Sequence, residues 1–262
     1  MGVINTTPDS FSDGGAFFKT DSAVRHALEL VEQGADILDI GGESTRPGAE
    51  KVSLQEELDR VIPVIERLKN LTDTPISIDT YKAAVMHDAV LAGASMVNDV
   101  NGLRSLGALE CVAELGVPVC IMHMQGKPEN MQAAPKYSRV VDDVSQFFTE
   151  RISACLAAGI KQDDILLDPG IGFGKTLQHN LQLLNHIPEI RLQHGCDVLL
   201  GVSRKSLIDA LLSRPVGQRL PASLGLAVQG VLNGVKIVRV HDVRETHDAV
   251  RMVEAVVNSE YL

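Results

Sequence analysis

Eight short runs rich in Val, Ile and Leu recur along the chain, and each is followed by a segment long enough to form a helix. The runs are almost continuously hydrophobic, which is typical of strands covered on both faces, as in a parallel sheet. This repetition constrains the fold more than any other feature of the sequence. The runs are GVIN (2–5), DILDI (36–40), PISID (75–79), SMVN (95–98), PVCIM (118–122), ILLD (165–168), VLLGV (198–202) and KIVRV (236–240).

The segments between these runs carry helical patterns. Ser53 and Glu56 have the spacing of a capping box at the start of one helix, within which Pro63 predicts a kink or a break. Strand-and-helix units that repeat over 262 residues without a linker predict a (β/α)8 TIM barrel, a single domain over residues 1–262, with a doubly wound sheet as the alternative. Apolar stripes at helical spacing are formed by Val24, Ala27, Leu28 and Val31, which end before Gly34, and by Thr246, Val250, Val253 and Val257.

Composition argues against several classes of protein. A formal net charge of −10 and a pI near 5.2 disfavour a nucleic acid partner, because binding phosphates requires clustered Lys and Arg. The start MGVINTTPDSF is too polar for a signal peptide, and no apolar run has the length of a membrane span. Four cysteines lie far apart without a CxxC pair, which favours reduced thiols and a cytoplasmic location over disulfides or a zinc site.

The stretch DPGIGFGK (168–175), followed by Thr176, resembles a phosphate-binding loop without matching one. Gly174, Lys175 and Thr176 fit the end of the Walker pattern, but its first glycine would have to stand at Pro169, which has no N–H to offer a phosphate. The dinucleotide fingerprint fails as well, because its glycines have another spacing. We therefore expect no nucleotide here, and we expect Lys175 to be solvated or to stand at a helix start.

Polar residues end nearly all the expected strands. In a barrel of this type the active site forms at the carboxyl ends of the strands. A single Asp or Asn at such a place is more often a helix cap or a turn former. Caps alone would not require acids, amides, a lysine and an Arg-His pair around one mouth, so we interpret the set as an active site. Its members are Asn5, Asp39, Asp79, Asn98, Asp168, the run from Ser203 to Ser206, Arg239 and His241.

The chemical character of these residues indicates what the site holds. Two acids and an amide suit a flat heterocycle with an amino-amidine edge, which a carboxylate grips through two parallel hydrogen bonds. Three bases suit a phosphorylated group, and a serine at the helix start after the seventh strand suits a carboxylate. The two acids are Asp79 and Asp168, and the amide is Asn98. The three bases are Arg46, Arg239 and His241, and the serine is Ser206.

Eight segments of the chain together resemble the dihydropteroate synthase family of bacterial folate synthesis. The resemblance implies a (β/α)8 transferase that joins 6-hydroxymethyl-7,8-dihydropterin pyrophosphate to p-aminobenzoate and releases pyrophosphate with Mg²⁺ bound. It also implies a homodimer and a target of sulfonamides, which mimic p-aminobenzoate. The segments are INTTPDSFSDGG (4–15), DIGGESTRPGA (39–49), ISIDT (76–80), MVND (96–99), MHMQG (122–126), LDPGIGFGK (167–175), SRKS (203–206) and RVHDV (239–243).

Carried over motif by motif, the resemblance implies a role for each site residue. The implied pterin contacts are Asp79, Asn98, Asp168 and Lys205, with Met122 in the pocket wall. The implied pyrophosphate contacts are Asn5, Arg46, Arg239 and His241, with Asn5 also a Mg²⁺ ligand. The implied p-aminobenzoate contacts are Phe11, Thr45, Pro47, Phe173 and Ser206, assisted by Asp13 on a first loop that closes. The implied catalytic set is Lys205, Asp79, Asp168, Arg239 and His241.

The expected chemistry is a dissociative substitution. The methylene carbon that carries the pyrophosphate is attached to an electron-rich dihydropterin, which delocalises positive charge. Asp79 and Asp168 would favour the cation, while the bases and Mg²⁺ would stabilise the departing pyrophosphate. We expect Arg239→Ala to keep the fold and to lose about 3 kcal/mol or more of transition-state stabilisation.

Other functions stay open at this point. A pterin-binding barrel of a corrinoid-dependent methyltransferase would share the Asp and Asn positions but would leave RVHD and STRPG without a purpose. A catalytically silent pterin-binding regulator would bind both substrates without turnover, and a Schiff-base aldolase would use Lys205. We interpret His123 as a satisfied loop histidine rather than a metal ligand. Relatives often carry residues before the GVIN strand, so the segment that closes their barrel floor is expected to be absent here or to precede Met1.

Overall fold

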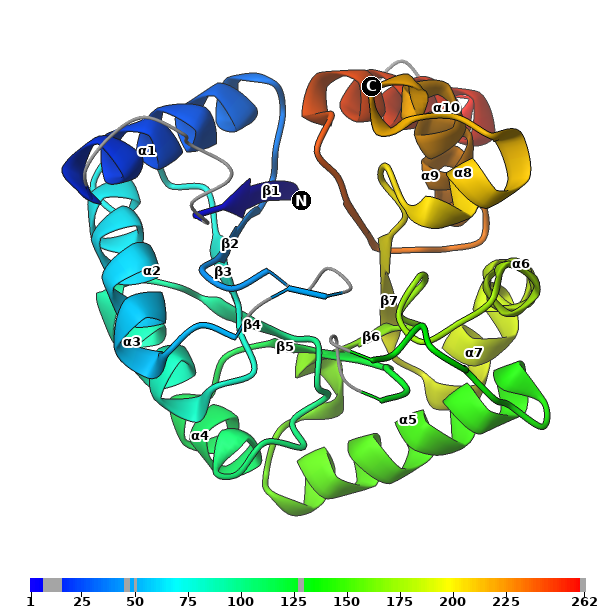
Figure 1. Ribbon diagram of the computed structural model, residues 1–262, viewed down its shortest axis with the longest axis horizontal. Helices are drawn as coiled ribbons and strands as arrows, with labels where there is room; N and C mark the ends of the chain where they lie inside the picture. The colour runs from blue at the N-terminus through cyan, green and yellow to red at the C-terminus, as the bar shows by residue number, and fades with distance from the viewer. Residues whose placement is uncertain (7–15, 45–47, 50, 127–129, 260–262) are drawn as a thin grey trace.

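Eight parallel strands follow one another around a barrel in the order of the sequence (Figure 1). The computed structural model describes residues 1–6, 16–44, 48–49, 51–126 and 130–259, with the main chain alone for residues 16–19. The last strand returns to the first, because Val3 N donates to Val240 O at 3.1 Å and Val240 N donates to Met1 O at 3.0 Å. The strands are β1 (Gly2–Asn5), β2 (Leu38–Gly41), β3 (Ile76–Asp79), β4 (Met96–Asp99), β5 (Val119–Met122), β6 (Ile165–Asp168), β7 (Asp197–Gly201) and β8 (Ile237–Arg239).

The predicted (β/α)8 barrel is therefore confirmed, and the closed order of strands rules out the doubly wound alternative. Helices form an outer ring around the strands (Figure 1). None of the described helices is long and apolar enough to cross a membrane. The helices are α1 (Ala16–Glu32), α2 (Leu54–Leu68), α3 (Ala83–Ala92), α4 (Ala108–Leu115), α5 (Val140–Ala157), α6 (Leu177–Asn185), α7 (Ile187–His194), α8 (Ser206–Leu212), α9 (Leu220–Leu232) and α10 (Val243–Asn258).

Helix α2 corrects two details of the sequence prediction. It runs unbroken through Pro63, because the side chains on either side of the proline are buried against the barrel and offset the lost main-chain hydrogen bond. Ser53 Oγ accepts from Glu56 N at 3.2 Å, as a helix cap does. The Glu56 carboxylate pairs with Arg60 instead of returning to Ser53, so only half of the predicted capping box forms.

The alternation of side chains along each strand decides what lies inside the barrel. Side chains two positions apart point to the same side of a sheet. At the amino ends the interior is filled by an apolar floor, and the residues two positions further along line the upper barrel. The floor consists of Met1, Ile37, Met96, Cys120, Leu166, Leu199 and Ile237. The residues two positions beyond six of them are Asp39, Asn98, Met122, Asp168, Gly201 and Arg239.

Candidate active site at the barrel mouth

The strand register brings the predicted polar residues to one opening, the carboxyl end of the barrel, which we call the barrel mouth. Residues paired on neighbouring strands stand at the same height, so the last residues of the strands form a ring. Met1 packs in the apolar floor at the other end, so the mouth is the polar end of the barrel. The paired positions are Asn5–Gly41, Gly41–Asp79, Asp79–Asn98, Met122–Asp168 and Gly201–Arg239.

Arg239 lies at the centre of a buried cluster in this mouth. Its Nε donates to Asp39 Oδ2 at 2.6 Å, and its Nη2 donates to Asp79 Oδ2 at 2.8 Å. Asn98 Nδ2 also donates to Asp39 Oδ2, at 3.1 Å. Asp39 is fully buried, so the guanidinium supplies the countercharge that this carboxylate needs. The sequence assigned Arg239 to an anion alone and gave Asp39 no role of its own.

Burial and charge act in opposite directions on this cluster. Burial raises the pKa of Asp79 to about 7, although Arg239 works against that rise and Asp39 adds to it. Burial favours the neutral form of Arg239 too, but Asp39 and Asp79 together hold its pKa above the ordinary value. The buried atoms Asp39 Oδ1 and Asp79 Oδ1 have no hydrogen-bond partner within the described residues. Each leaves an acceptor that a donor on a ligand would satisfy.

Asp168 faces the same mouth as Arg239, with which it interacts electrostatically. Its Oδ1 accepts from Gly170 N at 2.7 Å, and burial raises its pKa, against the effects of that N–H group and of nearby lysines. One of these is Lys205, whose pKa burial lowers to about 8 while Asp168 opposes the change. Lys205 Nζ stands 4.2 Å from the ring centroid of Phe173. A carboxylate, an amine and an aromatic ring thus meet on one side of the mouth.

The segments after β7 and β8 are tied to each other. His241 N donates to Ser203 Oγ at 3.2 Å, and His241 Nδ1 lies 3.1 Å from the same oxygen. Arg204 Nε donates to Asp242 Oδ2 at 3.0 Å, with the Arg204 main chain in the left-handed region at φ +58°. Lys205 stands at the N-cap position of α8, and Ser206 is the first residue of that helix. These contacts fix the predicted basic residues relative to the mouth.

Met122 belongs to an apolar cluster beside the mouth. It is buried in a small cluster near the end of β5, and Phe173 and Tyr81 pack against that cluster. The other members of the cluster are Val100, Met124 and Met131. A flat ring held at the mouth would therefore meet carboxylates at its edge and apolar side chains at its faces.

Some predicted residues lie outside the part of the chain that the structure describes. These are Phe11, Asp13, Thr45, Arg46 and Pro47. Asn5 is described and stands, half-buried, at the carboxyl end of β1. Within the described ranges, no group of three or more His, Cys, Asp or Glu residues could hold a metal ion.

The sequence predicted that Lys175 is solvated or stands at a helix start. It does directly precede Thr176, the N-cap of α6, but the prediction of a solvated side chain is wrong, because this side chain is only 3% exposed. Its Nζ donates to Gly170 O at 2.9 Å and to Phe173 O at 3.0 Å, and it lies 3.0 Å from His123 Nδ1. The sequence could not predict this burial, because the partners of the lysine include main-chain carbonyl groups, which every residue has. The expectation of a satisfied His123 agrees with this contact.

A second network was not found from the sequence. Lys82 Nζ donates to Glu43 Oε2 at 2.6 Å, to Glu57 Oε2 at 2.5 Å and to Val52 O at 2.7 Å. Thr80 Oγ1 donates to Glu57 Oε1 at 2.6 Å. Although burial favours the neutral amine, the two glutamates raise the pKa of Lys82. The network fixes the segment that follows β2, which leads into the STRPG motif.

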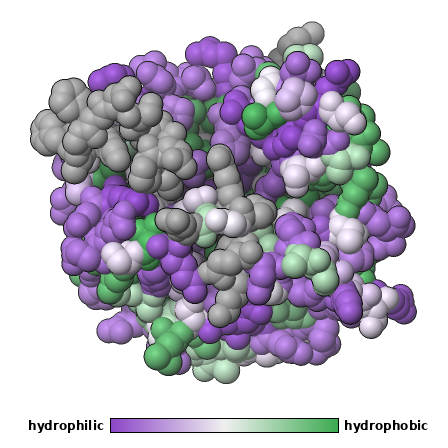
Figure 2. All heavy atoms as spheres, in the orientation of Figure 1, coloured by the Kyte–Doolittle hydropathy of each residue, from purple (hydrophilic) through white to green (hydrophobic). Residues whose placement is uncertain are grey.

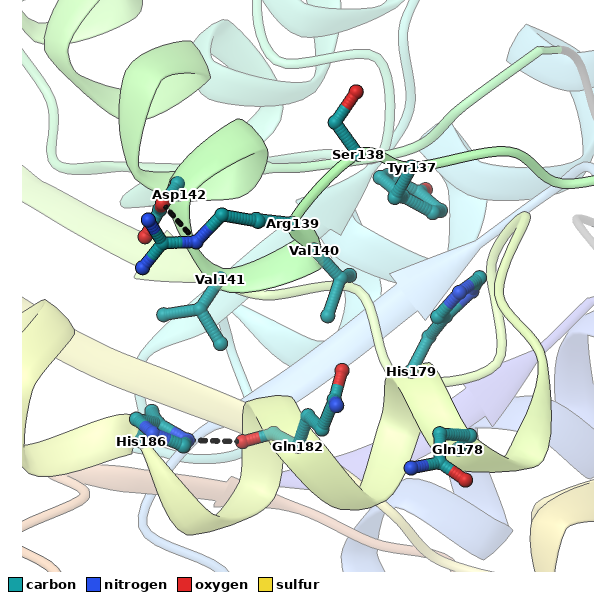
Figure 3. Close-up of a pocket in the computed structure, with 10 residues that line it drawn as sticks. All are labelled: Tyr137, Ser138, Arg139, Val140, Val141, Asp142, Gln178, His179, Gln182 and His186. Atoms are coloured by element: carbon teal, nitrogen blue, oxygen red, sulfur yellow. Dashed lines mark hydrogen bonds and ion pairs between the residues drawn. The ribbon is translucent and has the colours of Figure 1, made fainter.

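A separate pocket of about 470 Å³ lies between the start of α5 and helix α6 (Figure 3). None of the residues that line it belongs to the predicted site. Its Tyr137 hydroxyl donates to Gly174 O at 2.8 Å, so the pocket adjoins the glycine-rich loop from outside. His179 packs edge-on against Tyr137, with ring centroids 4.9 Å apart, and caps α6 together with Thr176.

Comparison with known proteins bears on this site. A sequence profile of the pterin binding enzyme family matches residues 1–241. The dihydropteroate synthase of Haemophilus influenzae is 50% identical over 259 residues, covering 99% of this chain and 94% of the relative. The Yersinia pestis dihydropteroate synthase in a sulfonamide drug complex superposes with a TM-score of 0.93 at 50% identity, covering 98% of this chain and 94% of that one. The Xanthomonas albilineans dihydropteroate synthase in complex with 7,8-dihydropteroate gives a TM-score of 0.88 at 47% identity, covering 98% and 92%.

Proposed function

The chain belongs to the pterin binding enzyme family, among its dihydropteroate synthases, and from that membership we propose how the barrel mouth carries out the reaction. The enzyme is a transferase that condenses 6-hydroxymethyl-7,8-dihydropterin pyrophosphate with p-aminobenzoate to give 7,8-dihydropteroate and pyrophosphate. One observation supports this proposal above all: Asp168 and Arg239 face the same mouth. Acids could therefore bind one group of the substrate there while bases bind another.

The acids would hold the pterin. Asp168 has one oxygen engaged by Gly170 N, which fixes the carboxylate for a bidentate grip on an amino-amidine edge. Asp79 Oδ1 is buried without a described partner and would accept from the ring. Asn98 is already oriented by its bond to Asp39, and Met122 would pack against a ring face.

The bases would receive the diphosphate. Arg239 is locked by Asp39 and Asp79, so its charge is in place before the substrate arrives. His241 is oriented by Ser203, and Asn5 stands at the end of β1. Arg46, outside the described residues, completes the proposed set. A fixed charge needs no reorganisation when the bond breaks, which is what lowers the barrier.

The p-aminobenzoate would bind beside Lys205 and Phe173. The start of α8 offers Ser206 and main-chain N–H groups to the carboxylate of the substrate. Phe173 would cover the benzoate ring, with Phe11, Thr45 and Pro47 as further proposed contacts outside the described residues. A sulfonamide would compete here, since it mimics the same substrate.

The reaction we propose is dissociative. The bond between the methylene carbon and the diphosphate oxygen breaks, and its electron pair leaves with the pyrophosphate. The positive charge spreads over the dihydropterin, where Asp79 and Asp168 would stabilise it. The neutral amine of p-aminobenzoate then forms the new carbon–nitrogen bond and loses a proton to the departing pyrophosphate or to water. Lys205, near both Asp168 and Phe173, would balance charge between the two substrates.

Magnesium fits this mouth as an ion carried by the substrate. Mg²⁺ prefers oxygen ligands and usually keeps several waters while it binds phosphates and one or two protein groups. The described residues hold no three-ligand cluster, whereas the Asn5 side chain offers one oxygen at the proposed diphosphate end. When bound, the ion would neutralise charge on the leaving pyrophosphate.

Two further properties are part of the proposal. Large hydrophobic side chains are exposed on α9 and α10, which pack side by side (Figure 1). Figure 2 shows hydrophobic surface among polar residues on the same side of the molecule. The exposed side chains on α9 and α10 include Leu232, Met252, Val256 and Val257. A second copy of the chain would cover them, giving a homodimer whose mass sedimentation would report. The four cysteines are free thiols, which supports a cytoplasmic location.

A product assay tests the proposed function. The protein is given both substrates with Mg²⁺, and dihydropteroate and pyrophosphate are measured together. We expect equal amounts of both products, and we expect excess chelator to stop turnover. Binding of both substrates without products would support a silent regulator. Borohydride trapping of an adduct on Lys205 would support an aldolase, and methyl transfer without pyrophosphate would support a methyltransferase.

A further inference from the structure

The loop between β6 and α6 is pressed main chain to main chain against the segment that follows β5. Gly170 and Gly174 have φ values of +66° and +61°. A Cβ atom on Gly170 would lie 1.9 Å from His123 O, and one on Gly174 would lie 2.5 Å from Gln125 O. Only glycine permits both this conformation and this approach. The two segments therefore meet without intervening side chains.

The buried side chain of Lys175 bonds to both segments of this contact. Its Nζ donates to Gly170 O and Phe173 O in its own loop, and to His123 O at 3.2 Å across the contact. Burial lowers the pKa of Lys175 to about 7, with Asp168 opposing. His123 Nδ1 lies 3.0 Å from the same Nζ, so the amine has four partners in the two segments. The lysine is thus a cross-link between two loops.

The groups held by this cross-link belong to the proposed site. Phe173, whose carbonyl accepts from Lys175, places its ring over Lys205 Nζ. Gly170, whose carbonyl also accepts from Lys175, donates its N–H to Asp168 Oδ1. A shift of the loop would move the aromatic ring most, because Asp168 is also held by β6.

We propose that Lys175 is a positioning residue that ties the glycine-rich loop to the segment after β5 and so sets Phe173 at the wall of the p-aminobenzoate site. This rests on the proposed function for the places of Phe173 and Asp168. It goes beyond that function because the proposed function gives Lys175 no contact with a substrate. A lysine that only filled space would change stability and leave substrate affinities alone.

The test compares Lys175→Met with Lys161→Met. Both variants exchange a lysine for a side chain of similar length, but Lys161 is exposed and precedes β6 at the opposite end of the barrel. In Lys175→Met we expect the KM for p-aminobenzoate to rise about 10-fold or more, because small misplacements of a positioning group have large effects. The KM for the pterin pyrophosphate should change less than about 3-fold, since Asp168 keeps its strand. Lys161→Met should match the wild type in both.

A milder variant guards against a fold defect. Tyr137→Phe removes only the hydroxyl that donates to Gly174 O, on the pocket side of the same loop (Figure 3). We expect the KM for p-aminobenzoate to rise about 2-fold or more, without a change in the KM for the pterin pyrophosphate. Amide exchange of residues 170–174 should be faster in both variants, whether or not the wild type makes product, so the cross-link is judged separately from the proposed function. Unchanged exchange and an unchanged KM for p-aminobenzoate in Tyr137→Phe and in folded Lys175→Met would overturn the inference.

Discussion

Arg239 shows how a single residue can serve the fold and the site together. Its guanidinium neutralises the fully buried Asp39 and also holds Asp79 at the mouth. Removing one partner of a buried ion pair costs about 3–5 kcal/mol, because the other charge is left unpaired in the interior. The sequence suggested that Arg239→Ala keeps the fold, since it could not show that the arginine on β8 has acids on β2 and β3 as its partners.

The pairing gives a prediction with two separable parts. Arg239→Ala should lower the free energy of unfolding by about 3 kcal/mol or more and reduce kcat/KM at least about 100-fold. The double variant Asp39→Asn, Arg239→Ala should recover more than about 1 kcal/mol of stability, since the fully buried Asp39 carboxylate is no longer left unpaired, while turnover stays lost. Urea unfolding and steady-state kinetics measure the two parts. A double variant as unstable as the single one would contradict the pairing argument.

Asp79 gives a prediction on pH. Burial raises its pKa to about 7, so at pH 6 it is mostly protonated and at pH 8 mostly ionised. The ionised form pairs with Arg239 and would stabilise the pterin cation. We expect kcat/KM for the pterin pyrophosphate to rise between pH 6 and pH 8, with a midpoint about 7. Asp79→Asn should be slower and should lack this rise. A wild-type profile that is flat over the range would count against the assignment.

At the scale of elements, the strands could be predicted from the sequence and the contacts of the loops could not. Strand positions followed from the apolar runs to within a residue or two, because burial on both faces leaves a clear pattern. Loop contacts could not be predicted from the sequence, because Lys175 and Lys82 are held by carbonyls and acids from segments distant in the sequence. The break that was one of the two predictions at Pro63 does not occur, since tertiary burial of α2 overrides a local preference.

The glycine-rich loop allows a matched test of close packing. Gly170 and Gly116 have nearly the same φ, +66° and +64°, but a Cβ on Gly116 would meet no atom within 4 Å. Gly116→Ala should therefore cost about 1 kcal/mol of backbone strain alone. Gly170→Ala should cost about 3 kcal/mol or more, because a main-chain carbonyl must move. Equal losses of stability in urea unfolding would show that the two segments do not touch as described.

For the whole molecule, the closed barrel brings side chains that alternate along each strand together into one site at the mouth. Because side chains alternate along a strand, an apolar floor at the amino ends places the next inward residues at the mouth. This is why the set of strand-end polar residues could be read from the sequence with no knowledge of distances. The pairing among them could not be read, because a ring of eight positions allows many partners. Asp39 is the example, since its place was predicted but its bond to Arg239 was not.

The central claim is that acids at this mouth hold the pterin while bases hold the diphosphate. Equilibrium binding of the pterin pyrophosphate and of the pterin alcohol, which lacks the diphosphate, tests it most directly in the wild type, Asp168→Asn and His241→Ala. His241 is chosen because Ser203, on the segment after β7, orients its imidazole. We predict that Asp168→Asn weakens both ligands by the same factor, and that His241→Ala weakens only the pyrophosphate form. Equal weakening of both ligands by His241→Ala, or none of either by Asp168→Asn, would contradict the account.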